Sequence, residues 1–527
     1  MTEAAPSPPA FPRLGAFVCP DGSTTFRVWA PERRRVAVIV GSQHHDMAAG
    51  PHGVFEVRLP VGDGTDYRFA LDDGNALPDP WSARQPEGVR GASRVVDLAG
   101  WPAGQVAGSS WPGVPLEDLV IYELHVGTFS SAGTFEGVIP RLSELRELGV
   151  TAIEVMPVAS FAGHHGWGYD GVYTFAPHEP YGGPAGFARL VQAAHEAGLG
   201  VILDVVYNHL GAGADQVKAF APYMTNRHET FWGAAIDYGR RPVREWAIQN
   251  AEMWVRDYGV DGLRLDAVHA IFDDSPTHVM AELARRVKRI NPATLLISEM
   301  EIGDLRPIEE WGHDAQWEDA LHHACHALLT GEQEGYYSDY GQVADLAREL
   351  ERPQGRRFVV CAQNHDQVGN RALGDRLRGA GLRLAAFCAI LSRGTPMLFA
   401  GEEYDEAHPF QYFTDHIDPE IARMTREGRR REFADFSGFG AEEIPDPQDP
   451  DTFDRSKLDP SAGDSAHREY YRGLLKLRRR LPDELTVTGI DEGRRLLKFR
   501  RGQAEFVANF SDQEQDGVPA RAGQVRQ

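Results

Sequence analysis

Four short segments rich in acidic and amide side chains, spread through the middle of the chain, most constrain its fold. Each follows an apolar run that is typical of a buried strand. Carboxylates at the carboxyl ends of successive strands allow a barrel enzyme to gather acids in one pocket. Two such carboxylates with different pKa values can cleave a bond between sugars. The segments are 204–209, 262–267, 296–299 and 363–367.

Between these segments an amphipathic helix, a glycine and an apolar strand recur. Gly149, Gly198 and Gly259 stand where the helices should end, because glycine readily adopts the left-handed conformation. Amphipathic helices alternating with continuous apolar strands indicate parallel βα units, and their number predicts a (β/α)8 TIM barrel. The barrel is expected over 116–482, with a helical insertion near 302–357, which is too long for one βα unit. The expected strands are 119–124, 151–155, 201–205, 262–266, 294–299, 358–364 and 396–400.

The regions on either side have a different composition. Short alternating stretches separated by Gly, Pro and Asp predict an N-terminal β-sandwich over 13–98. It is expected to follow a disordered Pro/Ala/Ser-rich tail, 1–12, and to be joined to the barrel by a linker, 99–115. Residues 483–527 hold only two or three strand-like runs and predict a short, incomplete C-terminal β-domain.

The charge balance argues against two classes of partner. There are 54 Lys and Arg against 77 Asp and Glu, a formal net charge of -23. Such a chain should repel nucleic acid and anionic membranes, whereas neutral glucans meet no such penalty. The sequence shows no signal peptide and no run near the ~18 apolar residues of a membrane helix, so a cytoplasmic protein is expected.

The four cysteines are scattered, without paired spacing. They predict reduced thiols and neither a disulfide framework nor a zinc site. We expect no metal and no cofactor, and the sequence does not indicate the oligomeric state. The cysteines are Cys19, Cys325, Cys361 and Cys388.

Arg264 and Asp266 lie two residues apart on an expected strand, so their side chains face the same way. A guanidinium beside a carboxylate lowers the carboxylate pKa and keeps it ionised. An ionised, oriented Asp is what a glycosidic nucleophile must be. The pair by itself fits a purely structural ion pair equally well.

Glu299 ends an otherwise apolar strand. A carboxyl in apolar surroundings has a raised pKa and stays protonated near neutrality, which suits a general acid. The alternative for this residue alone is a helix-capping Glu at a strand–helix turn.

Two further clusters lie at strand ends. Asp204 is followed by Asn208 and His209, and His365 adjoins Asp366. These groups could hydrogen-bond sugar hydroxyls, or could simply pack polar loops. A zinc site lacks the necessary spacing, and calcium at Asn208 lacks a run of ligands.

Trp167 and Tyr169 lie in a Gly-rich loop, where aromatic rings can present flat faces to pyranose rings. Such rings are as often part of a core. Each feature is ambiguous by itself, but four acid-bearing strand ends in order at barrel spacing favour catalysis.

These four segments resemble the signature regions of the α-amylase superfamily of retaining glycoside hydrolases, over about residues 14–481. The resemblance implies that Asp266 is the nucleophile, Glu299 the acid/base and Asp366 the third acid, which stabilises the transition state. The N-terminal β-sandwich resembles the glycan-binding-type module of branching and debranching members. The resemblance also implies a supporting role for Asp204, His209, Arg264 and His365, and a sugar-stacking role for Tyr169.

Finer motifs resemble the members that act on trehalose-capped chains: 166–171, 330–337, 363–370, 401–404 and 431–433. This implies hydrolysis of the α-1,4 bond next to the terminal trehalose of maltooligosyltrehalose, with maltooligosaccharides as the other ligands. Met300 departs from the polar or acidic residue expected after Glu299.

Three alternatives to trehalose release remain open from the sequence. One is an α-1,4-glucan branching or debranching enzyme of the same superfamily. Another is a non-catalytic glycan-binding protein on the same barrel. The presence of both the nucleophile and the acid argues against it. A nucleotide- or phosphate-using transferase lacks a Gly-rich phosphate loop.

Trehalose selectivity should reside on the leaving-group side of the cleft. His269, three residues after Asp266, is a candidate, and ordinary loop packing is its alternative role. The other candidates, at or after expected strand ends, are Glu154, Trp317, Asp319, Phe410 and Tyr412.

Overall fold

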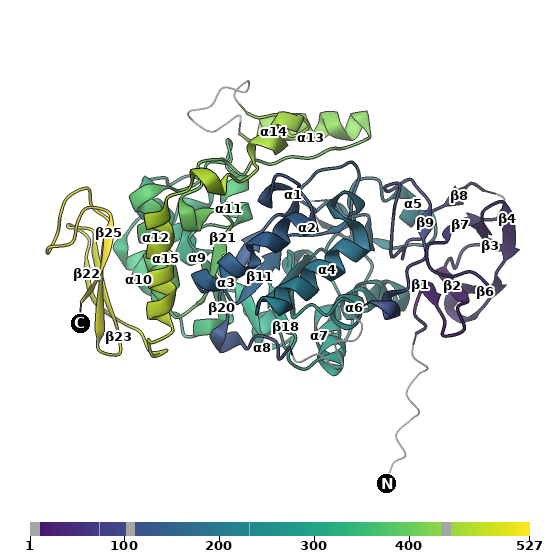
Figure 1. Cartoon of the computed structure of the whole chain (residues 1–527), viewed down its shortest axis with the longest axis horizontal. Coiled ribbons are helices and arrows are strands. Elements are labelled where there is room, and N and C mark those ends of the chain that lie inside the picture. The colour runs from purple at the N-terminus through teal and green to yellow at the C-terminus, as the bar shows by residue number, and fades with distance from the viewer. Residues whose placement is uncertain (1–10, 73, 102–110, 231, 434–443, 527) are drawn as a thin grey trace, which may run out of the picture.

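The computed structural model describes residues 11–72, 74–101, 111–230, 232–433 and 444–526. Most of the expected tail and the middle of the expected linker lie outside the described residues. The molecule is elongated, with an N-terminal β-domain at one end, a barrel in the middle and a C-terminal sheet at the other end (Figure 1). None of the described helices is long and apolar enough to span a lipid bilayer.

Eight parallel strands close into a barrel, which confirms the predicted fold class. The first strand pairs with the last, Ile121 opposite Met397, and so closes the ring. Most of the strand residues are apolar and buried, as parallel strands covered by helices require. The strands are β10 (Ile121–Leu124), β11 (Ala152–Val155), β14 (Gly200–Val205), β17 (Gly262–Leu265), β18 (Leu295–Ser298), β19 (Ala315–Trp317), β20 (Phe358–Cys361) and β21 (Thr395–Phe399).

One barrel strand, β19, was not predicted from the sequence. β19 has only three residues and lies inside 302–357, the stretch expected to be a helical insertion. Three residues are too few to give a recognisable apolar run. The same stretch also holds three helices: α8 (Arg306–Glu309), α9 (Ala320–Thr330) and α10 (Val343–Leu350).

Amphipathic helices surround the barrel. Gly149 ends α3 in the left-handed conformation, with φ 119°, and its N–H bonds to the Leu145 carbonyl, as the sequence predicted. The main covering helices are α3 (Leu142–Leu148), α4 (Gly183–Glu196), α6 (Arg241–Arg256), α7 (Val279–Ile290), α12 (Gly379–Leu391) and α15 (Ser465–Arg478). Further helices are α1 (Val126–Phe129), α2 (Phe135–Val138), α5 (Asp215–Lys218), α11 (His365–Gly369), α13 (Pro419–Glu432) and α14 (Pro450–Arg455).

The N-terminal domain consists of two antiparallel sheets. One has the order β1-β2-β6-β5, and the other has the order β4-β3-β7-β8, with β9 also paired to β7. Phe26, Val28 and Phe69 are fully buried in this domain. The strands are β1 (Gly15–Val18), β2 (Thr24–Trp29), β3 (Val36–Val40), β4 (Gln43–Asp46), β5 (Ala48–Ala49), β6 (Val54–Leu59), β7 (Asp66–Leu71), β8 (Ala76–Leu77) and β9 (Ser93–Arg94).

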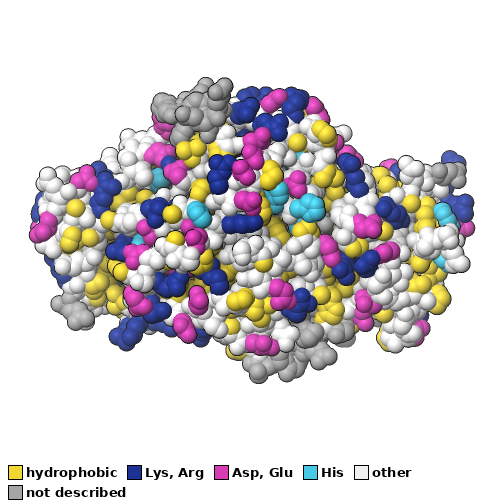
Figure 2. Space-filling model, turned by 45° about the horizontal axis from the view of Figure 1, so that its top comes forward, with side chains coloured by type: hydrophobic (Ala, Val, Ile, Leu, Met, Phe, Trp, Pro, Cys, Tyr) yellow, Lys and Arg dark blue, Asp and Glu magenta, His cyan; other side chains and the backbone are white. Residues whose placement is uncertain are grey.

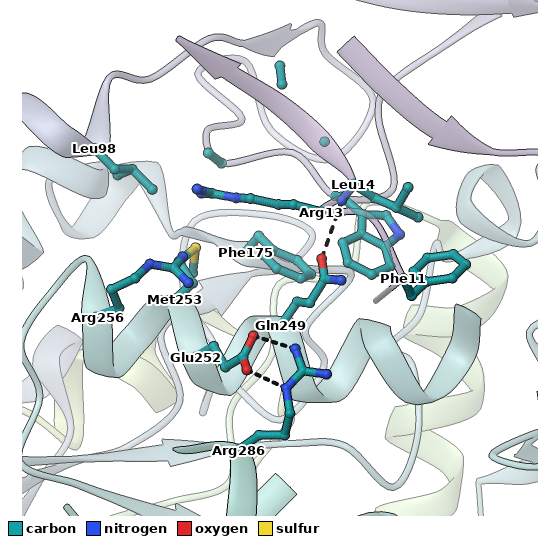
Figure 3. Close-up of a pocket in the computed structure, with 14 residues that line it drawn as sticks. Phe11, Arg13, Leu14, Leu98, Phe175, Gln249, Glu252, Met253, Arg256 and Arg286 are labelled. Atoms are coloured by element: carbon teal, nitrogen blue, oxygen red, sulfur yellow. Dashed lines mark hydrogen bonds and ion pairs between the residues drawn. The ribbon is translucent and has the colours of Figure 1, made fainter. Parts of the chain in front are cut away.

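Aromatic contacts attach this domain to the barrel. Trp81 stacks on Phe175 of β13 (Tyr173–Pro177) with ring centroids 5.0 Å apart, and its indole N–H lies 3.3 Å from the Tyr223 hydroxyl. A cavity of about 140 Å³ lies at this junction. Its polar lining groups bond within the protein: Gln249 accepts the Leu14 N–H, and Arg286 pairs with Glu252 (Figure 3).

The C-terminal sheet has four antiparallel strands, where the sequence had shown two or three runs. It packs on α12, with the rings of Phe387 and Phe506 6.1 Å apart. Acidic and basic side chains are intermixed on the face shown in Figure 2. The strands are β22 (Thr486–Asp491), β23 (Leu496–Arg501), β24 (Ala504–Asn509) and β25 (Ala522–Arg526).

Candidate active site

Arg264 is the centre of the candidate site. It lies on β17 and is fully buried. Its Nη1 donates to Asp204 at 2.6 Å and to Asp266 at 2.9 Å, and its Nη2 donates to Glu299 at 2.8 Å. These carboxylates come from β14 and from the ends of β17 and β18, three adjacent strands, so the topology brings them to one guanidinium. Burial lowers the pKa of Arg264, but the surrounding carboxylates outweigh burial and raise it well above its ordinary value.

Asp266 is held from a second side by Asn208. The Asn208 amide donates to Asp266 Oδ2 at 2.7 Å and to its backbone carbonyl at 2.9 Å. The next residue, Ala267, has φ 41°, an uncommon left-handed conformation for a residue with a side chain. Its N–H then points at Glu299 Oε2, 2.8 Å away. Strain of this kind persists where the surroundings fix it, and here it aims a donor at the second acid.

Glu299 differs from expectation in its surroundings. Its side chain is 22% exposed and accepts hydrogen bonds from Arg264 and from the Ala267 N–H. The apolar environment predicted from its strand is therefore wrong, because the strand side chains do not surround the carboxyl. The groups that do surround it come from the neighbouring strand, β17, and the turn after it.

His365 and Asp366 begin helix α11 beside this cluster. His365 Nε2 lies 2.7 Å from the Tyr169 hydroxyl and 3.5 Å from Asp366 Oδ1. The Tyr169 ring stacks on the His365 ring, 5.1 Å away, and its hydroxyl donates to Asp204. Asp366 is partly exposed. The structure thus joins Asp204, Tyr169 and His365 by hydrogen bonds, and His365 to Asp366 by an ion pair.

His209 lies at the edge of the cluster. Its Nδ1 contacts Asn208 Oδ1, and its Nε2 lies 3.0 Å from the Tyr169 carbonyl. The Trp232 ring stacks on the His209 ring at 4.4 Å and is 48% exposed. Trp232 was not predicted, because nothing in the sequence connects this loop to the four segments. His269 is exposed.

Two candidates from the sixth strand and the loop after it belong to the same cluster. The Trp317 ring lies 4.0 Å from the Arg264 guanidinium carbon. Asp319 accepts a long hydrogen bond, 3.5 Å, from Asn364. Burial, together with the charges of Glu299 and Asp366, raises the pKa of Asp319 to about 7.

Some predicted binding residues are packed away from a ligand. Phe410 is 1% exposed and stacks on the buried ring of Trp167 at 5.3 Å, with the partly buried Tyr412 against the same indole. Trp167 and Phe410 form part of an aromatic cluster behind the site, and their sugar contacts stay a prediction. Glu154 is likewise buried in the barrel, and within the described part of the chain neither of its carboxyl oxygens has a hydrogen-bond partner.

Glu123 was not among the predicted site residues. It lies on β10, is 1% exposed, and its carboxylate contacts His365 Nδ1 at 2.5 Å. An acid inside an expected apolar strand was the available signal, but nothing in the sequence named its partner.

Comparisons with known proteins identify the family of the barrel. The family model described as "Alpha amylase, catalytic domain" matches residues 108–235 and 234–431. A putative α-amylase from Salmonella typhimurium has a crystal structure that superposes with a TM-score of 0.89 at 35% identity, covering 97% of this chain and 99% of that one. A pullulanase from Paenibacillus barengoltzii shares the fold, with a TM-score of 0.72 at 21% identity over 95% of this chain and 89% of its own.

Curated relatives narrow the family. A malto-oligosyltrehalose trehalohydrolase from Rhizobium sp. (strain M-11) is 42% identical over 93% of this chain and 91% of its own length. The protein of that name from Mycobacterium tuberculosis (strain H37Rv) is 40% identical over 92% of both chains. The superfamily expected from the four segments is thus confirmed, and the chain belongs to the malto-oligosyltrehalose trehalohydrolase family of α-amylase-type glycoside hydrolases.

Proposed function

We propose that this chain hydrolyses the α-1,4 bond next to the terminal trehalose of maltooligosyltrehalose, releasing trehalose and a shorter maltooligosaccharide. The observation that carries the proposal is the sharing of the Arg264 guanidinium by Asp266 and Glu299. One cation holds two carboxylates close together at the barrel mouth, which a double displacement requires. The names of the relatives supply the trehalose-capped substrate.

In the first step an Asp266 oxygen attacks the anomeric carbon of the glucose that is linked to trehalose. The bond from that carbon to the bridging oxygen breaks, and Glu299 gives its proton to this oxygen, so trehalose leaves with a complete hydroxyl. Asn208 and Arg264 bind the two Asp266 oxygens and orient the nucleophile.

In the second step Glu299 takes a proton from water, and the water oxygen attacks the anomeric carbon of the glycosyl–enzyme. The bond to Asp266 breaks and the carboxylate is restored. Two inversions retain the configuration, and the two carboxyls of a retaining pair lie roughly 5–5.5 Å apart. We assign the stabilisation of the developing positive charge to Asp366, and hydroxyl contacts to His209 and His365.

The test is incubation with a trehalose-capped maltooligosaccharide, followed by chromatography of the products. The proposal predicts free trehalose and a shortened chain whose newly formed end has the α configuration by NMR. New α-1,6 branch points would instead identify a branching enzyme, and binding without turnover a non-catalytic glycan-binding protein.

Asp266→Asn is expected to lower kcat by roughly 10,000-fold or more, because it removes the nucleophile. Ordinary turnover by that variant would refute the role of Asp266. The His269→Ala variant addresses selectivity. It is expected to reduce the preference for the trehalose-capped chain over a plain maltooligosaccharide of equal length, and an unchanged preference would remove His269 from the leaving-group side.

A further inference from the structure

Glu123 accepts two hydrogen bonds from His365 across the inside of the barrel. One carboxylate oxygen accepts the His365 Nδ1–H at 2.5 Å, and the other accepts the His365 backbone N–H at 2.9 Å. Strand β21 separates β10, which carries Glu123, from β20, which leads to His365. The contact therefore links the first strand to the segment after the seventh, and both side chains are almost completely buried.

The two hydrogen bonds fix the orientation of the His365 ring and the position of the start of α11. The bond to Nδ1 sets the rotation of the imidazole ring, so Nε2 faces the Tyr169 hydroxyl at 2.7 Å and Asp366 Oδ1 at 3.5 Å. The bond to the backbone N–H holds the first residue of α11, which also carries Asp366. A single carboxylate therefore orients the His365 ring and the start of the helix that presents Asp366.

The electrostatics agree with this geometry. Burial lowers the pKa of His365, but the carboxylates of Asp366 and Glu123 outweigh burial and raise it to about 10. His365 thus carries a positive charge beneath the cleft at neutral pH. The charged, titratable and aromatic groups that face it are Glu123 on β10, His125 after it, Glu154 on β11, Trp167, Tyr169, Arg264 on β17, Trp317 on β19 and Asp366 on α11.

Glu154 provides a natural control. It is the register partner of Glu123 on the next strand and is as deeply buried. Neither of its oxygens has a hydrogen-bond partner among the residues that the structure describes. Burial, followed by the charges of Glu123 and Asp204, raises the pKa of Glu154 well above its ordinary value. Two glutamates at the same level of the barrel therefore differ in whether they hold a site residue.

We propose that Glu123 is a positioning residue that acts through His365, fixing the ring by Nδ1 and the helix start by the backbone N–H. This proposal rests on the proposed glycosidase function, because it assigns His365 and Asp366 to the reacting glucose. Glu123 touches no substrate itself.

The test compares Glu123→Gln with Glu154→Gln. Glutamine has nearly the same shape but offers one acceptor oxygen and an NH2 group, so it cannot accept both His365 donors. For Glu123→Gln we expect kcat to fall about 100-fold with KM within about threefold, because orientation in the transition state is lost. Glu154→Gln should stay within about twofold of wild type in kcat.

A double variant shows whether the effect passes through His365. If it does, Glu123→Gln combined with His365→Asn should be no slower than His365→Asn alone. Multiplying losses, or a Glu123→Gln enzyme with normal kcat, would overturn the proposal. Should Glu123→Gln fail to fold, Glu123→Asp keeps the charge and is expected to give a smaller loss in kcat and a smaller decrease in the His365 pKa.

A readout without substrate separates this proposal from the proposed function. In protein with 15N-labelled histidine, the His365 resonance is identified by its loss in His365→Asn. Its pKa is expected to be lower by about one unit or more in Glu123→Gln and unchanged in Glu154→Gln. A wild type that releases no trehalose refutes the proposed function only. An unchanged His365 pKa in Glu123→Gln refutes the positioning role of Glu123.

Discussion

Arg264 in the barrel mouth and Arg478 at the end of α15 are both buried, but they bind opposite kinds of partner. Arg264 is bound by three carboxylates. Within the described ranges, Arg478 donates only to backbone carbonyls, those of Ile390 and Ser392 at 2.7 Å and that of Gly394 at 2.5 Å. These carbonyls lie at the end of α12 and just after it, where a cation is favoured.

The partners decide what each cation can do. The carboxylates raise the pKa of Arg264 well above its ordinary value, whereas burial, with the charge of Arg501 added, lowers the pKa of Arg478 to about 9. Arg264 is one cation among three acids, two of which are proposed to react. Arg478 closes a helix end and joins α15 to α12. Burial of an arginine therefore says little about function until its acceptors are known.

The largest expected effect comes from Arg264→Lys. Lysine keeps the charge but is a point donor without the planar fork that reaches Asp266 and Glu299 from two nitrogens. We expect kcat/KM on maltooligosyltrehalose to fall by about 1,000-fold or more, as for the loss of a preorganised electrostatic contact. Initial rates measure this, and a variant within about tenfold of wild type would contradict the central role of the guanidinium.

The same substitution at Arg478 should affect stability instead of catalysis. Lysine has three donors on one nitrogen but lacks the planar fork by which Nη1 and Nη2 reach the three carbonyls. Leaving buried acceptors unpaired costs about 2–3 kcal/mol of unfolding free energy. Thermal unfolding should show a lower melting temperature, while kcat stays within about twofold of wild type. A normal melting temperature, or lost turnover in a stably folded variant, would remove the contrast between the two arginines.

The smallest expected effect is a difference between wild type and Asp204→Asn in how stability depends on pH. Burial raises the pKa of Asp204 from 3.8 to about 7, although Arg264 opposes this. Between these values the folded state keeps a proton that the unfolded chain releases, so the contribution of Asp204 to stability falls as pH rises to about 7. Asp204→Asn does not titrate and so lacks this loss. Its free energy of unfolding, relative to that of wild type, should therefore rise by on the order of 1–3 kcal/mol from pH 4 to pH 7.

Melting temperatures of wild type and Asp204→Asn across this pH range measure the trend. Arg478→Lys serves as the control, because its deficit should stay constant over the same range. A difference for Asp204→Asn that does not change with pH would show that Asp204 has no raised pKa.

The barrel and the meeting of the acids could be predicted from sequence. Apolar runs ending in acids imply parallel strands, and the carboxyl ends of parallel strands share one edge, so Asp204, Asp266 and Glu299 had to lie near each other. β19 could not be predicted, because three residues carry too little pattern. The sequence also could not show that Arg264 reaches Glu299 and replaces the expected apolar surroundings.

Residue types and their spacing by themselves determined which groups are available: carboxylates, histidines and an arginine at strand ends. Only the tertiary structure decided which groups pair. Glu123 and His365 are 242 positions apart and meet because the barrel closes. Phe410, a predicted ligand contact, instead packs behind the site. Local patterns set strand and helix through backbone geometry, whereas the partner of a buried side chain depends on the packing of distant segments.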